Sequence, residues 1–183
     1  DTEKESLFIT TKTDPEGIAA LWFRELLRKK AGADGIRRME DYLEAHPVTL
    51  VFECVDMEHD PHVIEYPESR VILLDIVCNC MEYEKYSYEQ MCETAERLGL
   101  EHKELACVLP DWKAFADWYG QVNGKDYTYR GQRIEGFVIE DAAGRMVKLK
   151  GAYYRFWKQM RGLAKEIAGK GGIDRRHVWL DAE

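Results

Sequence analysis

The stretch IEGFVIEDAAGRMVKLK, residues 134–150, constrains the fold more than any other part of the sequence. Two short runs of β-forming residues, 134–140 and 145–150, flank the tetrapeptide DAAG. The glycine that ends this tetrapeptide, Gly144, suits the last position of a tight turn. The stretch therefore predicts an antiparallel hairpin, which any fold for this chain has to contain.

The other predicted strands and helices do not alternate regularly along the chain. Short apolar runs predict strands over 6–11, 48–55, 70–77 and 103–109, and the second and third of these are apolar enough for burial on both faces. Helical spacing predicts helices over 15–30, 36–45, 87–98, from Pro110–Asp111 onward, and over 152–168 with a stop at GKGG, 169–172. This order favours an α+β fold with largely antiparallel sheets and flanking helices over a doubly wound sheet.

The charge of the chain is divided unevenly. Of the 183 residues, the first 144 hold 16 lysines and arginines against 30 acidic residues, whereas the last 39 hold 10 against 4. A basic end on an acidic body suits a local site for phosphate groups, and a basic solvated helix explains it equally well. The net charge of −8 argues against a general nucleic-acid coat protein.

The cysteines and the apolar runs indicate a cytoplasmic protein with no membrane span. Five cysteines stand at spacings that fit neither a disulfide framework nor a zinc site. Reduced, partly buried thiols are therefore expected. No apolar run approaches the roughly 18 residues of a membrane span, and no secretory signal is visible. Because the first residue is Asp1, we expect a processed chain or a piece of a longer one.

Two lysines and two carboxylates stand in unusual places. Lys148 and Lys150 share one face of the predicted second hairpin strand, and an anion between them would relieve their mutual repulsion. An exposed strand face would also accommodate both lysines. Glu53 and Glu135 lie in apolar runs, where a carboxylate needs a partner or a metal. Gly136 indicates a backbone that something approaches closely. Together these residues suggest a site for a nucleotide and a metal.

The same residues carry a resemblance to a known superfamily. FE at 52–53, EGFV at 135–138 and VKLK at 147–150 resemble motifs III, IV and V of the covalent nucleotidyltransferases. LFITTK, ending in Lys12, and the run from FECV to VILLDIV resemble the RNA-ligase branch that contains phage T4-type RNA ligase and fungal tRNA ligase. Tyr154 stands where that branch tends to carry an aromatic residue. The resemblance spans about residues 6–157 and implies a nucleotidyltransferase-type, ATP-grasp-like ligase domain.

The resemblance also implies an activity and its site residues. A motif I lysine would attack ATP to form lysyl-AMP, AMP would pass to an RNA 5′-phosphate, and a 3′-hydroxyl would displace it and seal the strand. Glu53 would bind the ribose, Glu135 the Mg²⁺ or Mn²⁺, and Lys148 and Lys150 the phosphates, with Lys12 and Tyr154 in the nucleotide pocket. Lysines and a metal ion stabilise charge on phosphoryl oxygens, as these steps require.

The chain departs from the branch at motif I. It contains no K-x-D-G or K-x-N-G, and the family spacing would place the nucleophilic lysine about twenty residues before Lys12 and so before Asp1. We therefore expect an N-terminally incomplete ligase domain over 1–168 with a tail over 169–183, which is either a fragment of a longer ligase or a degenerate form. Without an upstream segment that supplies the lysine, it should be inactive in self-adenylylation.

Two other interpretations remain open. The same fold could act as a non-catalytic module that binds AMP or RNA ends, or the glutamate and lysine pattern could be purely structural. HDPH at 59–62 and CNC at 78–80 are weak metal candidates because neither has a full ligand set. Asp75, in a second apolar run, is expected to pair with an arginine. The RNA that is sealed, in repair or in splicing, is left open.

Overall fold

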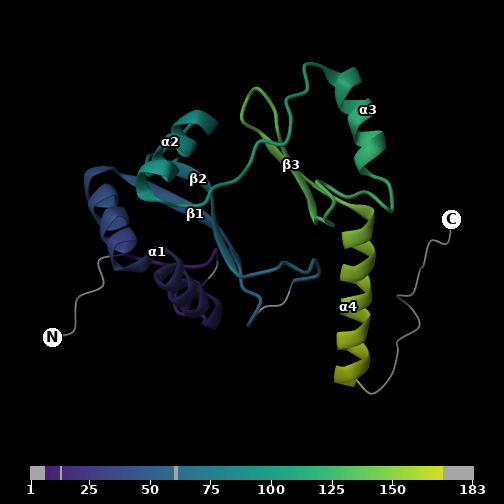
Figure 1. The fold of residues 1–183 in the computed structure, drawn as a ribbon, viewed down its shortest axis with the longest axis horizontal. Helices are drawn as coiled ribbons and strands as arrows, with labels where there is room; N and C mark the ends of the chain where they lie inside the picture. Colours follow the sequence, from purple (N-terminus) through teal and green to yellow (C-terminus); the bar gives the residue numbers. More distant parts are fainter. Residues whose placement is uncertain (1–6, 13, 60–61, 171–183) are drawn as a thin grey trace. The chain divides into compact units, whose positions relative to one another are not determined.

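A computed structural model describes residues 7–12, 14–59 and 62–170, and its α+β architecture is shown in Figure 1. The chain divides into two compact units, with the boundary between residues 106 and 107. The elements, in chain order, are α1 (Ile18–Ala45), β1 (Val48–Val55), β2 (Arg70–Cys78), α2 (Tyr88–Leu98), α3 (Trp112–Val122), β3 (Gly136–Glu140), β4 (Met146–Lys150) and α4 (Ala152–Lys170). Across the described residues, none of the helices combines the length and the apolar character that a membrane crossing needs.

The core of the first unit lies between its helices and one face of the antiparallel pair β1–β2. Figure 1 shows α1 and α2 beside this pair. Their apolar side chains meet those of the strands in one buried cluster: Leu26, Leu27, Met39, Tyr42, Val48, Val71, Leu73, Ile76, Met91, Ala95 and Leu98. Burial of such side chains supplies most of the stability of a small α+β unit.

The opposite face of β1 is open, which corrects one prediction. Val48–Val55 forms a strand as predicted, but Thr49, Val51 and Glu53 are exposed while Leu50, Phe52 and Cys54 are partly buried. The apolar composition suggested burial on both faces. Helices of the first unit cover only one face, so alternate side chains of β1 reach solvent.

A bulge interrupts the pairing of β1 with β2. Val51 pairs with Asp75, but the next residue of β1, Phe52, pairs with Leu73, so Leu74 has no partner across the ladder. The extra residue reverses the faces of β2 on either side of it. Leu73 and Ile76 are therefore both fully buried, although a regular strand would place residues three apart on opposite faces.

Two predicted strands are absent from the described structure. Residues 7–11 of the predicted strand 6–11 are irregular, and Ile9 O accepts a hydrogen bond from the Arg24 guanidinium. The segment 103–109 is also irregular. The bridge to β2 is centred on His102, where Leu73 N donates to Glu101 O at 2.8 Å and Leu73 O accepts from Lys103 N at 2.8 Å, so pairing reaches only the first residue of the segment. Both segments have the composition of strands, but a strand also needs a partner along its length.

The helices follow the sequence signals closely. The two helices predicted over 15–30 and 36–45 form the single α1, interrupted at Gly32, whose φ of 66° and ψ of 174° are not helical. The helix begins three residues after Pro15, because the Asp14 carboxylate accepts a hydrogen bond from Glu16 N at 2.9 Å and holds a turn there. Gly99 ends α2 in the left-handed conformation, as predicted.

The second unit contains the predicted hairpin between two helices. β3 and β4 pair antiparallel, with Gly136 opposite Lys150 and Val138 opposite Lys148. The Asp141 carboxylate closes the turn by accepting from Ala143 N at 2.9 Å and Arg145 N at 3.0 Å. α4 follows β4 directly and continues to Lys170, so the first half of GKGG is helical; residues 171–172 lie outside the described residues. The prediction of an α+β fold with antiparallel sheets is confirmed.

Candidate functional site

The candidate residues are divided between the two units. Lys12 and Glu53 belong to the first unit, and the second contains Glu135, Lys148, Lys150 and Tyr154. That Glu53, Glu135, Lys148 and Lys150 line one cleft, with Lys12 nearby, stays a prediction. In the second unit, Glu135 and Tyr154 both contact Lys150.

An ion pair stands at the mouth of the hairpin. The Lys150 ammonium contacts the Glu135 carboxylate, and their side chains are 35% and 28% exposed. Glu135, a carboxylate in an apolar run, was expected to need a partner or a metal, and Lys150 of the neighbouring strand is that partner. Lys148 lies on the same face of β4 as Lys150 but is exposed, opposite the exposed Val138. This face therefore presents one paired and one solvent-facing cation.

Gly136 makes this geometry possible. Its φ is +147°, and a Cβ at this position would lie only 1.9 Å from the carbonyl oxygen of Leu149. Any other residue would collide with the backbone of β4. The backbone that approaches Gly136, as the sequence predicted, is therefore that of the partner strand. The glycine holds Glu135 next to the end of β4, where Gly151 N donates to Glu135 O at 2.8 Å.

Tyr154 lies under two cations in the first turn of α4. It is 8% exposed, and its ring centroid is 4.7 Å from Lys150 Nζ and 5.6 Å from Lys158 Nζ. A tyrosine ring attracts a cation above its face. Tyr154 therefore helps to position the Lys150 ammonium, and Lys158, one helical turn further on, shares that ring.

In the first unit, Lys12 and β1 meet at a hollow of about 470 Å³. Lys12, Trp22, Phe23, Phe52 and Cys54 are among the residues that line it. Glu53 lies between two of these lining residues but is exposed, so the expectation that it is a costly buried carboxylate is wrong. An aromatic-lined hollow with one lysine at its edge has the character of a small-ligand site.

An Asp–His pair adjoins this hollow, and the sequence singled out only its histidine, as the first residue of HDPH. Asp56 is buried and its carboxylate contacts His59 Nδ1 at 2.9 Å, while the His59 ring stacks on Trp22 with centroids 4.9 Å apart. Burial raises the pKa of Asp56, but hydrogen bonds from His59 and from Glu58 N outweigh it, so that pKa is lowered overall. The bond to Asp56 raises the pKa of His59.

Neither weak metal candidate gains support. Within the described ranges, no three His, Cys, Asp or Glu side chains gather as a metal site would require. Residues 60 and 61 of HDPH lie outside those ranges, and all five cysteines are free thiols. Glu135 therefore belongs to no group of three or more such side chains among the described residues. That donor set fits Mg²⁺, which is held by one or two carboxylates when substrate phosphates and water complete its shell.

The fold and these residues define an α+β protein whose hairpin presents a lysine–glutamate pair beside a second lysine. The sequence matches the family model described as RNA ligase, of the T4 type, over residues 1–154. The chain therefore belongs to the RNA ligase family. No curated protein matches the chain.

Proposed function

We propose that this chain forms the adenylyltransferase part of a cytoplasmic, ATP-dependent RNA ligase. A lysine amine from an upstream segment attacks the α-phosphorus of ATP, forming a P–N bond as pyrophosphate leaves. An RNA 5′-phosphate oxygen then attacks the same phosphorus and releases the lysine. Finally, a 3′-hydroxyl oxygen attacks the RNA 5′-phosphorus, and AMP leaves as the strand is sealed. Membership of the RNA ligase family supports this reaction class.

The observation that carries the proposal is the Glu135–Lys150 pair with Lys148 on the same strand face. Each of the three steps builds negative charge on phosphoryl oxygens. A lysine held in place by a carboxylate and a tyrosine ring stabilises that charge without further reorganisation. Lys148, exposed two residues earlier, provides a second cation for the same phosphates.

The other candidates have supporting roles in this proposal. Glu53, exposed on the open face of β1, would accept hydrogen bonds from the ribose hydroxyls. Lys12 would contact the nucleotide at the edge of its hollow. Glu135 would provide a ligand for Mg²⁺ or Mn²⁺, which when bound neutralises charge on the substrate phosphates. Its ion pair with Lys150 then couples the phosphate and metal contacts.

Sealing of pre-adenylylated RNA tests the proposal with residues 1–183 alone. The last step uses no nucleophilic lysine, so the chain should join AMP-capped RNA to a 3′-hydroxyl strand in the presence of Mg²⁺. Lys148→Ala or Lys150→Ala should slow single-turnover sealing by about 10²–10³-fold, the usual effect of removing one preorganised contact to a reacting group. Glu135→Ala should be partly rescued by high Mg²⁺ or by Mn²⁺.

Lys113→Ala is the matched control. Lys113 lies on α3 in the same unit, its side chain is 87% exposed, and it pairs only along its own helix, with Asp117. Its removal should leave the sealing rate unchanged. Lys158 is a poorer control because its ammonium lies over the Tyr154 ring. Equal sealing rates for Lys148→Ala and Lys113→Ala would contradict the proposed role of the hairpin lysines.

Self-adenylylation provides a second test. Residues 1–183 contain no lysine in a motif I context, so incubation with ATP and Mg²⁺ should leave the intact mass unchanged. A protein that also carries an upstream K-x-D/N-G segment should gain the mass of one AMP. A gain of AMP by residues 1–183 that survives denaturation would show that another lysine is the nucleophile.

A further inference from the structure

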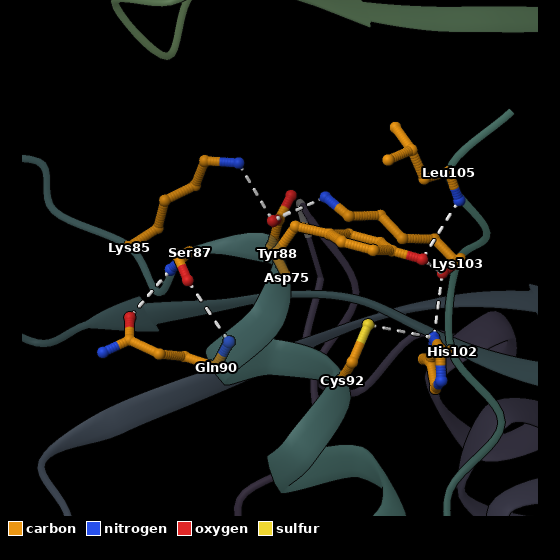
Figure 2. A network of polar contacts seen from close by, with 9 residues as sticks. All are labelled: Asp75, Lys85, Ser87, Tyr88, Gln90, Cys92, His102, Lys103 and Leu105. Carbon is orange, nitrogen blue, oxygen red and sulfur yellow. Dashed lines mark hydrogen bonds and ion pairs between the residues drawn. The ribbon is translucent and has the colours of Figure 1, made fainter. Parts of the chain in front are cut away.

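The buried ion pairs around Asp75 lie outside the hairpin chemistry and have a structural role. Figure 2 shows Asp75 of β2 between Lys85 and Lys103, which reach it from opposite sides. Lys85 Nζ is 3.1 Å and Lys103 Nζ 2.8 Å from the same oxygen, Asp75 Oδ1. The prediction that Asp75 pairs with an arginine is therefore wrong. These contacts hold the segments that carry the two lysines against β2.

One face of α4, in the second unit, has no role in the hairpin chemistry. Tyr154, Trp157, Lys158 and Arg161 stand at positions i, i+3, i+4 and i+7 of this helix, so they share a face, which we call the Trp157 face. The Trp157 side chain is 46% exposed, and Lys158 and Arg161 are exposed beside it. Aromatic rings interleaved with basic side chains are typical of surfaces that bind single-stranded nucleic acid.

Neighbouring rings hold the Trp157 side chain in place. The Phe156 ring meets it edge-on, with centroids 5.4 Å apart and planes at 83°, and the Tyr153 ring lies 6.2 Å away on the preceding turn. The Arg133 guanidinium in turn lies over the Tyr153 ring, 4.6 Å from its centroid. A ring that its neighbours already hold loses little conformational freedom when a base stacks on it. Trp157 is therefore suited to stack on a base.

α4 is a basic element of an acidic chain. Its sequence contains five lysines and arginines against one acidic residue, Glu166, whereas the whole chain has a net charge of −8. Within the part of the chain that the structure describes, Lys158 forms no ion pair, and its ammonium lies over the Tyr154 ring. The sequence left open whether the basic end is a solvated helix or a site for phosphates. Cations beside a half-exposed tryptophan favour a site for phosphates that are attached to bases.

The Trp157 face adjoins the hairpin site through Tyr154. The Tyr154 ring centroid is 4.7 Å from Lys150 Nζ and 5.6 Å from Lys158 Nζ, so the two ammonium groups are at most 10.3 Å apart, the sum of these distances. A strand with one phosphate at Lys150 can therefore place a nearby phosphate at Lys158. We propose that α4 binds single-stranded RNA next to the end that is joined, with a base stacked on Trp157 and a backbone phosphate at Lys158. This inference rests on the proposed ligase function, whose substrate is RNA.

Binding of a short, unstructured, fluorescently labelled RNA to residues 1–183, measured by anisotropy at several salt concentrations, tests this site. Trp157→Leu should weaken binding by about tenfold, because one base–aromatic stack is lost, and should leave the salt dependence unchanged. Trp157→Tyr keeps a ring on the same face and should retain most of the affinity. Lys158→Gln should weaken binding and lower the slope of log affinity against log salt concentration by about 0.7, because one phosphate contact is lost.

Two residues of α3, in the same unit, provide matched controls. Trp112 is 78% exposed, and Lys113 has a side chain that is 87% exposed and pairs with Asp117. α3 contains one lysine and one aspartate, so it lacks the surplus positive charge of α4. Trp112→Leu and Lys113→Gln should therefore leave both the RNA affinity and its salt dependence unchanged.

The inference is overturned if Trp157→Leu binds RNA as tightly as Trp112→Leu does, or if Lys158→Gln and Lys113→Gln show the same salt dependence. Two other occupants of the Trp157 face would also overturn it. Loss of binding to anionic phospholipid vesicles in Trp157→Leu, with RNA affinity unchanged, would identify a membrane surface. Loss of self-association in sedimentation, again with RNA affinity unchanged, would identify an interface between two copies of the chain.

Sealing of AMP-capped RNA separates this inference from the proposed function. Trp157→Leu should raise KM for RNA and leave kcat unchanged, whereas Lys148→Ala should lower kcat. A chain that seals such RNA with the same KM after Trp157→Leu would retain the ligase proposal and lose this site. A chain that binds RNA through Trp157 without sealing AMP-capped RNA would retain this site and lose the ligase proposal.

Discussion

Replacement of Gly136 by alanine should open the hairpin that carries Glu135 and Lys150. The new Cβ would lie 1.9 Å from Leu149 O, whereas real Cβ atoms essentially never come within 3.0 Å of such an atom. One of the two strands must therefore move by more than 1 Å. A positive φ adds about 1–2 kcal/mol for a residue with a Cβ. Loss of the adjacent bond from Gly151 N to Glu135 O adds about 1 kcal/mol. The hairpin should lose about 3 kcal/mol.

Hydrogen exchange of peptides from residues 134–150, followed by mass spectrometry, measures this loss locally. Two glycines of the same unit provide controls. Gly144→Ala should cost only about 1 kcal/mol, because φ is +77° but nothing lies within 4 Å of the new Cβ. Gly162→Ala, in open space on α4, should stabilise the helix by up to about 1 kcal/mol. Equal exchange rates in the Gly136 and Gly144 variants would refute the steric argument.

Three further changes probe the first unit. The lowered pKa of Asp56 makes its contribution to stability present above its ordinary value of 3.8 and lost as pH falls through the folded pKa. Because the pKa of His59 is raised, its contribution to folding stability is complete below pH 6.5 and is lost as pH rises through the folded pKa. His59→Gln should therefore reduce the fall of the urea unfolding midpoint with rising pH. Ser87→Ala removes the capping box of α2 and should cost about 1 kcal/mol in urea unfolding, which Ser87→Thr should largely restore. The hydrogen bond to Tyr42, followed by burial, raises the pKa of Tyr86 to about 12, so Tyr86→Phe should remove one late-titrating phenol from an ultraviolet titration; an unchanged late phase would contradict the assignment.

Local signals in the sequence predicted the parts of the fold that depend on local chemistry. The hairpin over 134–150, with Gly144 at its turn, and the end of α2 at Gly99 follow from backbone conformations that glycine favours. The open face of β1 does not follow from composition, because it depends on which layers pack against the strand. The segment 103–109 has strand composition, but pairing with β2 ends at Lys103. Partners distant in sequence decided both cases.

In the candidate site too, local sequence predicted some features, whereas others depend on residues distant in the chain. Alternation along β4 correctly placed Lys148 and Lys150 on one face, but only the pairing of the strands reveals that Glu135 meets Lys150. The resemblance to ligases provided no reason to examine Lys85 or Lys103. The available signal was Asp75 itself, a carboxylate within an apolar strand. Its partners stand 10 and 28 residues away, so sequence spacing could not identify them.

The unpaired Leu74 makes β2 sensitive to length as well as to composition. Deletion of this one residue would make the ladder regular. It would also move the side chains of the segment before it to the opposite face of the sheet, so that Leu73 would leave the core for solvent. A substitution at Leu74 alters one side chain, whereas a deletion reassigns every side chain from Arg70 to Leu73. The strand should therefore tolerate substitutions far better than insertions or deletions, and insertions or deletions acceptable to this unit should fall between β1 and β2 instead.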